Sequence, residues 1–150
     1  MNKICFMCSD GGHLVEMKEI YKELSKYDSF FVTLRSEHLP KKIEGRKTYF
    51  LPKSERNPFL FLYNCIMDLS ILVKERPKII ISTGASFCIP AFVYAKILKI
   101  KTIYIETFAR INKPSLTGFI MYKLKPNLFF IQWKHHKKWF PKAIYKGGLF

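Results

Sequence analysis

The sequence predicts an α/β fold: a single doubly wound domain, residues 1–150, around a mostly parallel, Rossmann-like sheet. The first observation behind this prediction is that short apolar runs alternate along the chain with longer segments of helical periodicity. The second is that loops of small and polar residues follow several of these runs. The third is the composition, because 150 residues with 49% hydrophobic content can build one buried core.

Seven apolar runs have the length of strands, and the fourth is almost continuously apolar, as in a strand buried on both faces. The expected strands are residues 4–7, 30–34, 48–51, 78–82, 101–106, 128–131 and 143–146. The expected helices are residues 13–25, 59–73, 89–98 and 116–125. Strands that alternate with helices favour parallel pairing, because each crossover helix returns the chain to the same end of the sheet.

Ser9-Asp10-Gly11-Gly12-His13 joins the first expected strand to the first expected helix. Two adjacent glycines can take backbone angles that other residues avoid, and they let main-chain N–H groups approach a ligand closely. The helix that follows adds unpaired N–H groups and the positive end of its dipole, so the loop suits a phosphate. Its histidine adds a group that titrates near neutral pH. Glycines at an ordinary strand–helix turn give the same pattern, so both interpretations stand at this point.

Two more loops carry small and polar residues directly after a strand: residues 83–87 after the fourth strand and residues 106–110 after the fifth. Ligands of a doubly wound sheet bind beyond the carboxyl ends of its strands. Because parallel strands end at the same edge of the sheet, we expect these two loops and residues 9–13 to form one site. This convergence favours a binding role for the first loop.

The formal net charge is +15, from 26 Lys and Arg against 11 Asp and Glu. Such an excess indicates a polyanionic partner: nucleic acid, an anionic membrane surface or a phosphorylated substrate. The sequence lacks a helix-turn-helix pattern, a zinc module and the aromatic strand motif of RNA-binding domains. It also lacks the GxGxxG spacing, and Leu34-Arg35 puts no acid after the second strand, which disfavours a dinucleotide site. A basic nucleic-acid-binding domain and a stand-alone nucleotide-binding enzyme remain as alternatives.

Four cysteines lie in apolar stretches: Cys5, Cys8, Cys65 and Cys88. We expect free thiols in a reducing compartment. The first two have the spacing of a metal or redox pair, but no second pair follows, and Cys5 lies inside an expected buried strand. His135 and His136 are adjacent and point to different faces of a helix or strand. We therefore expect no metal and no cofactor, and the first apolar run is too short for a signal peptide.

Residues 59–73 form an unusually apolar expected helix, which Asn57 and Pro58 fit as N-cap and first helical residue. With 15 residues and Asp68 inside, the segment is too short and too polar to span a bilayer. A core helix is the plainer interpretation. A helix that dips into the membrane interface is the other, supported by the aromatic and leucine residues at 59–62.

Taken together, the loops resemble those of a known family. The residues concerned are Ser9–His13, Ser82–Ala85, Ile105–Arg110, Lys113–Gly118 and Gln132-Trp133. With them, the chain resembles the N-terminal half of the two-domain GT-B-type glycosyltransferases. It is more closely similar to the PssD-type proteins of bacterial capsule and exopolysaccharide synthesis. Those are relatives of the membrane-anchoring subunit of the eukaryotic transferase that adds the second N-acetylglucosamine to dolichol-linked precursors. The resemblance covers essentially the whole chain and is specific as a combination.

The resemblance implies a subunit with little or no activity alone, which supplies the acceptor side and the membrane contact of a glycosyltransferase. The implied partners are a donor-binding PssE-type subunit (the C-terminal half), a sugar linked to undecaprenyl pyrophosphate, and an anionic membrane surface; no nucleic acid is expected. The end of the chain at Gly147-Gly148, where a two-domain enzyme would enter its linker, fits this division.

Many relatives begin with a transmembrane helix, whereas this chain begins with its first strand. We therefore expect no transmembrane helix and a peripheral location on the cytoplasmic face of the inner or plasma membrane. The expected membrane contacts are Phe59, Phe61, Leu62, Lys123 and Lys125, and the basic segment 134–139 is a further candidate.

The resemblance also implies site residues. His13 matches the family's first glycine loop and is the candidate base for the acceptor hydroxyl, and Glu106 matches an acid at the end of the fifth strand. A structural role is open for both. The expected acceptor- and pyrophosphate-binding residues are Ser9, Gly11, Gly12, Thr83, Gly84, Ser86, Arg110 and Lys113. The expected partner interface is Gly147, Gly148 and Phe150.

Overall fold

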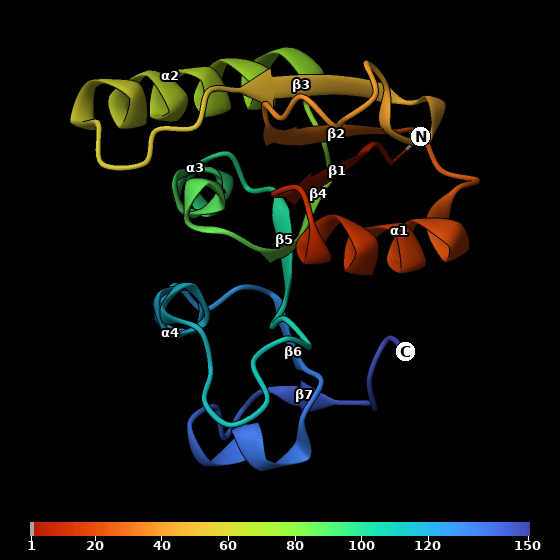
Figure 1. The fold of residues 1–150 in the computed structure, drawn as a ribbon, viewed down its shortest axis with the longest axis vertical. Helices are drawn as coiled ribbons and strands as arrows, with labels where there is room; N and C mark the ends of the chain where they lie inside the picture. The colour runs from red at the N-terminus through yellow and green to blue at the C-terminus, as the bar shows by residue number, and fades with distance from the viewer. Residues whose placement is uncertain (1) are drawn as a thin grey trace.

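Seven parallel strands form one sheet in the computed structural model, which describes residues 2–150 (Figure 1). The strands are β1 (Ile4–Cys8), β2 (Ser29–Leu34), β3 (Lys47–Leu51), β4 (Ile79–Gly84), β5 (Lys101–Ile105), β6 (Leu128–Ile131) and β7 (Ile144–Tyr145). Their order is β3-β2-β1-β4-β5-β6-β7, and each neighbouring pair is parallel. The predicted doubly wound fold is confirmed, and the order changes direction between β1 and β4.

Four α-helices and three 3₁₀ helices connect the strands. They are α1 (Gly12–Leu24), η1 (Ile43–Gly45), α2 (Pro58–Glu75), η2 (Ser86–Cys88), α3 (Ile89–Ile97), α4 (Leu116–Lys123) and η3 (Lys134–Lys138). The last expected helix is shorter than predicted because it ends at Lys123, and β7 has two residues where four were expected.

The helices cover the two faces of the sheet: α1 lies on one side, and α2, α3 and α4 lie on the other (Figure 1). Side chains of β1 alternate accordingly. Cys5 and Met7 join the core beneath α2 and α3, whereas Phe6 joins the core beneath α1. There Phe6 packs edge-on against Tyr21 of α1, with ring centroids 5.7 Å apart. Burial on both faces explains why the strands read as continuous apolar runs.

Helix α2 has clear signals at both of its ends. The side chain of Asn57 accepts hydrogen bonds from the N–H groups of Phe59 (3.0 Å) and Leu60 (3.2 Å), as an N-cap does. The helix ends where Arg76 takes a left-handed conformation with φ of 49°, followed by Pro77. Helix α2 is therefore 18 residues long, three more than predicted.

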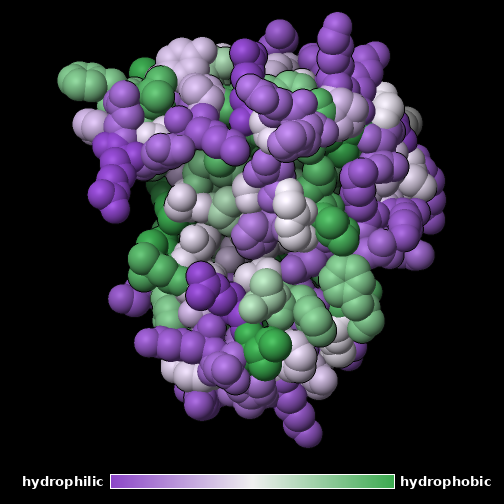
Figure 2. Space-filling model, viewed as in Figure 1, coloured by the Kyte–Doolittle hydropathy of each residue, from purple (hydrophilic) through white to green (hydrophobic). Residues whose placement is uncertain are grey.

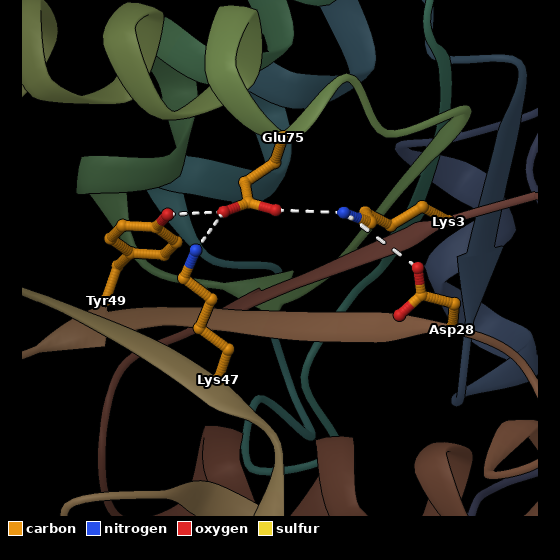
Figure 3. A network of polar contacts seen from close by, with 5 residues as sticks. All are labelled: Lys3, Asp28, Lys47, Tyr49 and Glu75. Atoms are coloured by element: carbon orange, nitrogen blue, oxygen red, sulfur yellow. Dashed lines mark hydrogen bonds and ion pairs between the residues drawn. The ribbon is translucent and has the colours of Figure 1, made fainter.

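A polar network anchors the C-terminal end of α2 to the amino end of the sheet (Figure 3). The carboxylate of Glu75 accepts hydrogen bonds from Lys3 (3.0 Å), which precedes β1, and from Lys47 and Tyr49 of β3. The Nζ of Lys3 also lies 3.9 Å from Oδ2 of Asp28. Burial raises the pKa of Glu75, but these hydrogen bonds and the charge of Lys3 outweigh it and lower the pKa to about 2.

Candidate functional site

The loop after β1 leads directly into the unprotected N-terminus of α1. Gly11 precedes the helix with φ of 75°, and α1 has neither a side-chain cap nor an acidic residue in its first turn. Gly11 and Gly12 are exposed, and a Cβ added to either would meet no atom within 4 Å. The space beside the first turn of α1 is therefore open, and no side chain caps this helix terminus, as an anion-binding terminus requires. Ser9 is half-buried beside them.

His13 is fixed against the end of β4 by two hydrogen bonds. Its Nδ1 lies 2.8 Å from the Thr83 carbonyl oxygen, and Thr83 Oγ1 donates to the His13 carbonyl at 2.8 Å. A carbonyl only accepts, so Nδ1 carries the proton in the neutral ring and Nε2 is the basic nitrogen. Gly84, with φ of 121°, makes room for the ring, because a Cβ there would lie 2.8 Å from His13 Cε1. The loops after β1 and β4 thus meet at His13.

Glu106 is fully buried at the end of β5, beneath the N-terminus of α4. Its Oε1 accepts from the N–H of Ser115 at 2.7 Å, and its Oε2 accepts from the Tyr104 hydroxyl at 3.0 Å. Burial raises the pKa of Glu106, while the bonds from Ser115 and Tyr104 and the charge of His13 oppose the rise. A Cβ on Gly118 would lie 2.1 Å from Oε2, so the carboxylate fills the space that this glycine leaves.

A second buried acid, Glu16 on α1, holds the loop after β5 from the other face of the sheet. It is 3% exposed, and its Oε1 accepts from Thr107 Oγ1 (2.7 Å) and from the N–H of Phe108 (3.1 Å). Its Oε2 accepts from Gln132 Nε2 at 3.1 Å. Glu16 has no predicted role, because an acid within an amphipathic helix is typical of a solvated position.

Gln132, at the end of β6, connects three parts of the site. Besides its bond to Glu16, its Nε2 donates to the Glu106 carbonyl at 3.0 Å, and its Oε1 accepts from the N–H of Leu149 at 2.9 Å. The C-terminal tail is therefore attached to the same residue as the loop after β5. The Phe150 ring also packs edge-on against Phe108, with centroids 5.8 Å apart.

The remaining predicted binding residues lie at the rim of this edge. Ser86 begins η2 and is exposed, while Arg110 and Lys113 are exposed in the loop between β5 and α4. Within residues 2–150, neither of these two cations forms an ion pair with an acid. Both are available to an anion. The geometry thus brings the three predicted loops to one edge of the sheet, with His13 between two of them.

The predicted membrane contacts lie on α2 and at the C-terminal end of α4. Helix α2 exposes a run of large apolar side chains that begins with Phe59 (82% exposed) and includes Phe61 and Leu62. Leu116, at the start of α4, is 77% exposed on the same side of the sheet. Hydrophobic side chains stand out among hydrophilic ones at the left edge of Figure 2, over α2 and α3. Lys123 and Lys125 lie at the C-terminal end of α4.

No helix within residues 2–150 combines the length and the hydropathy needed to cross a lipid bilayer. The same residues hold no group of three or more His, Cys, Asp and Glu side chains that would bind a metal ion. Cys5 and Cys8 point to opposite faces of the sheet, one into each core, which explains why their spacing does not form a pair. His135 and His136 both contact the carbonyl oxygen of Ile111 through Nε2.

The predicted partner residues border a hollow of about 350 Å³ on the α1 side of the sheet. Gly147 and Gly148 line it together with half-buried side chains of β5 and β6, among them Ile103 and Phe130. Helix α1 covers only part of this face of the sheet, so β5 and β6 stay partly open there (Figure 1). Phe150, beside the hollow, is 66% exposed.

Two proteins named as subunits of an N-acetylglucosamine transferase are similar in sequence to much of this chain. The rat protein named UDP-N-acetylglucosamine transferase subunit ALG14 is 25% identical over 137 residues, which cover 85% of this chain and 61% of the relative. The Candida albicans protein of the same name is 32% identical over 95 residues, 59% of this chain and 42% of the relative. This chain thus spans less than two thirds of the length of either relative.

Solved structures share the fold at low sequence identity. MurG of Acinetobacter baumannii matches 99% of this chain and 45% of its own chain, with a TM-score of 0.74 and 14% identity. UDP-N-acetylglucosamine 2-epimerase of Rickettsia bellii also matches 99% of this chain and 45% of its own chain, with a TM-score of 0.77 and 14% identity. At this identity the likeness shows the fold alone, the Rossmann-like fold of GT-B enzymes.

The family model for "Oligosaccharide biosynthesis protein Alg14 like" matches residues 53–149, about two thirds of the chain. The matched residues include the loops after β4 and β5, the Gln132 junction and nearly all of the C-terminal tail. The chain therefore belongs to the Alg14-like family of oligosaccharide biosynthesis proteins.

Proposed function

We propose that this chain is the acceptor-side, membrane-associating subunit of a two-chain glycosyltransferase in bacterial capsule or exopolysaccharide synthesis. A separate donor-binding subunit of PssE type, recruited and activated by this chain, binds the nucleotide sugar. The acceptor is a sugar linked to undecaprenyl pyrophosphate, presented at the cytoplasmic face of the membrane. The chain alone has little or no transferase activity. Membership of the Alg14-like family and the meeting of three loops at one sheet edge support this proposal.

The acceptor's pyrophosphate binds at the open N-terminus of α1. There it contacts Ser9, Gly11 and Gly12 and the first main-chain N–H groups of the helix. Arg110 and Lys113 add exposed cations from the loop after β5. Ser86 offers a hydroxyl from the loop after β4, beside Thr83 and Gly84, which hold His13. The exposure of Gly11, Gly12, Ser86, Arg110 and Lys113 on one edge of the sheet supports this placement.

His13 acts as the general base. Its Nδ1 is bonded to the Thr83 carbonyl, so Nε2 is the nitrogen that accepts the proton of the acceptor hydroxyl. Attack of that oxygen on the anomeric carbon of the donor sugar forms the glycosidic bond. The bond from this carbon to the phosphate oxygen breaks, and the nucleoside diphosphate leaves with its electrons. Glu106 is buried and hydrogen-bonded to Ser115 and Tyr104, so it positions the loop at the end of β5 and does not touch the acceptor.

The membrane contact is peripheral and is made by the helices on the α2 side of the sheet. The exposed apolar side chains of α2, led by Phe59, Phe61 and Leu62, enter the interface, and the lysines at the end of α4 meet anionic headgroups. The donor-binding subunit contacts the C-terminal tail at Gly147, Gly148 and Phe150. The half-open apolar face of β5 and β6 beside the tail supports this placement.

The observation that carries the proposal is the arrangement around His13, which connects an open helix N-terminus to the end of β4. The test is co-expression with the product of the neighbouring gene, followed by incubation with radiolabelled nucleotide sugars and a short-chain polyprenyl-pyrophosphate-linked sugar. We expect transfer to the lipid fraction by the two chains together and background transfer by either chain alone. Full-rate transfer by this chain alone would contradict the proposal.

A further inference from the structure

A basic, partly apolar hollow of about 570 Å³ lies at the opposite end of the molecule from His13. It opens beside the amino ends of β6 and β7 and the C-terminal end of α4. Three lysines line it, namely Lys123, Lys125 and Lys142, and no acidic residue does. Within residues 2–150 none of these lysines has a carboxylate within 4 Å. Three ammonium groups around one hollow repel one another, and a bound anion relieves that repulsion.

The walls of the hollow are fixed by the fold. The backbone N–H of Lys142 donates to the Tyr122 hydroxyl at 3.0 Å, which joins the end of α4 to the segment before β7. The Tyr122 ring packs against Phe129 and Phe140, with centroids 5.2 and 4.9 Å away. Lys125 takes a left-handed conformation with φ of 51°, where the chain turns from α4 towards β6. The lysines therefore extend from a rigid frame.

Part of the lining is apolar. Leu128 and Ile144, the first residues of β6 and β7, lie in the hollow, and Leu128 is 40% exposed. A small inorganic anion would pair with the lysines but leave this apolar surface in water. A ligand with a negative head and a short apolar part would satisfy both. The carbonyl groups at the end of α4 carry about half a negative charge, which three lysines exceed.

We propose that this hollow is a binding site for an anionic phospholipid, whose phosphate contacts Lys123, Lys125 and Lys142 and whose acyl chains lie against Leu128 and Ile144. The proposal rests on the membrane contact proposed above for the end of α4 and narrows it to one defined lipid site. This site is separate from the proposed acceptor site, and it requires neither a donor subunit nor sugar transfer. It would hold one lipid molecule at a fixed place on the protein, which a diffuse attraction between a charge of +15 and a membrane does not do.

The test is a calorimetric titration with dihexanoyl phosphatidylglycerol, kept below its micelle concentration so that no membrane surface forms. The pocket variant carries Lys123→Gln, Lys125→Gln and Lys142→Gln. Its matched control carries Lys26→Gln, Lys41→Gln and Lys96→Gln, which lower the net charge equally at exposed positions outside the hollow. We expect the pocket variant to bind about 10- to 100-fold more weakly and the control variant to change affinity by less than about twofold.

Two comparisons separate a phospholipid site from a plain anion site. Inorganic phosphate and the zwitterionic dihexanoyl phosphatidylcholine should each bind at least about tenfold more weakly than phosphatidylglycerol. Leu128→Gln should weaken phosphatidylglycerol binding and leave phosphate binding unchanged. Equal losses in the pocket and control variants would overturn the proposal, as would phosphate binding as tight as that of phosphatidylglycerol. The titration involves neither a donor subunit nor sugar transfer, so its failure would remove the lipid contact of Lys123 and Lys125 and leave the proposed acceptor role standing. Failure of the transfer assay would in turn leave the lipid site standing.

Discussion

Two of the buried acids, Glu106 and Asp68, lie in contrasting surroundings. Glu106, at the end of β5, is fully buried and accepts hydrogen bonds from Ser115 and Tyr104. Asp68, on the inner side of α2, is 1% exposed, yet neither of its oxygens has a hydrogen-bond partner within residues 2–150. Burial raises the pKa of both, and it raises the pKa of Asp68 to about 8.

The contrast separates two uses of a buried acid. At the carboxyl edge, the donors and Gly118 fit the Glu106 carboxylate closely, so the acid fixes the loop that carries Arg110 and Lys113. Beneath α2, the Asp68 carboxyl has no hydrogen-bond partner within residues 2–150, and its charge adds to burial in raising the pKa of Cys5 and Cys88. The first arrangement stabilises a site, while the second costs stability whenever the acid ionises.

The largest effect that would test this contrast is a pH dependence caused by Asp68. The pKa of its carboxyl is raised from 3.8 to about 8 on folding, so between those pH values the folded state binds more protons than the unfolded state. The free energy of unfolding should therefore fall as pH rises from 4 to 8, by roughly 5 kcal/mol at about 1.4 kcal/mol per unit of pKa. Urea unfolding at a series of pH values measures this.

Asp68→Asn removes the titrating group at nearly equal volume, so this decline in stability with pH should disappear in the variant. Glu37→Gln, at an exposed position, is the control and should keep the decline. If the parent chain and Asp68→Asn lose stability in parallel as pH rises, Asp68 is not the unpartnered acid that its surroundings indicate.

The next effect concerns catalysis at the carboxyl edge. His13→Ala removes the proposed base, and the assembled two-chain complex should lose about 10²- to 10⁴-fold in kcat. Its KM for the nucleotide sugar should stay unchanged, because the proposed partner subunit would bind the donor. The measurement is steady-state transfer to the lipid-linked acceptor, with assembly checked by co-purification. His38→Ala, in the exposed loop between β2 and β3, is the matched control. Unchanged turnover would leave His13 with a structural role only.

A third effect tests how closely the Glu106 carboxylate packs against Gly118. Gly118→Ala places a methyl group 2.1 Å from the resting position of Glu106 Oε2, so the carboxylate must leave its two donors. We expect a loss of about 2–3 kcal/mol in the free energy of unfolding, which is typical of a buried acid deprived of its hydrogen bonds. Gly12→Ala, where the added methyl meets no atom within 4 Å, should change stability far less.

A double-mutant cycle completes this test. Glu106→Ala also destabilises, because it leaves the Tyr104 hydroxyl and the Ser115 N–H without an acceptor. In that background Gly118→Ala no longer meets a carboxylate, so its added cost should be close to zero. Strict additivity of the two changes would show that the methyl group and the carboxylate do not compete for the same space.

The fold was predictable from local patterns because parallel strands covered on both faces leave a continuous apolar signal. Residues 78–82 illustrate this, since they match β4 closely. The meeting of the three loops was predictable too, because it follows from parallel topology alone and needs no side-chain geometry. The left-handed residue Arg76 and the extension of α2 to Glu75 were missed, since Lys74 and Glu75 look like a polar helix end.

The contacts that shape the site were not predictable in the same way. Glu16 and Gln132 lie 116 positions apart, and only the completed sheet brings α1 beside the end of β6. Gln132 was noticed as part of a motif, but its connection to Leu149 depends on where the tail lies. In the sequence, Asp68 argues only against a membrane-spanning helix, and no local pattern shows that it faces the sheet without a hydrogen-bond partner.

The smallest effect concerns an acid that contrasts with Asp68 on the same helix. Glu75 ends α2 with three donors around its carboxylate, and they lower its pKa from 4.5 to about 2 (Figure 3). This stabilisation is present above pH 4.5 and is lost as pH falls through 2, the reverse of the trend for Asp68. Glu75→Gln keeps the shape but removes the charge, and solvent screens the lysines, so we expect a loss of about 1 kcal/mol at pH 7.

That loss should vanish at about pH 1, well below the pKa of about 2, where the parent carboxyl is itself largely protonated. Glu23→Gln, on the exposed surface of α1, should change little at either pH and serves as the control. Glu75→Gln and Asp68→Asn together test whether hydrogen-bond donors decide the sign of the pH effect for acids on one helix. If Glu75→Gln stabilised the chain at pH 7, burial and not its three partners would govern this acid, and the distinction between partnered and unpartnered acids would fail.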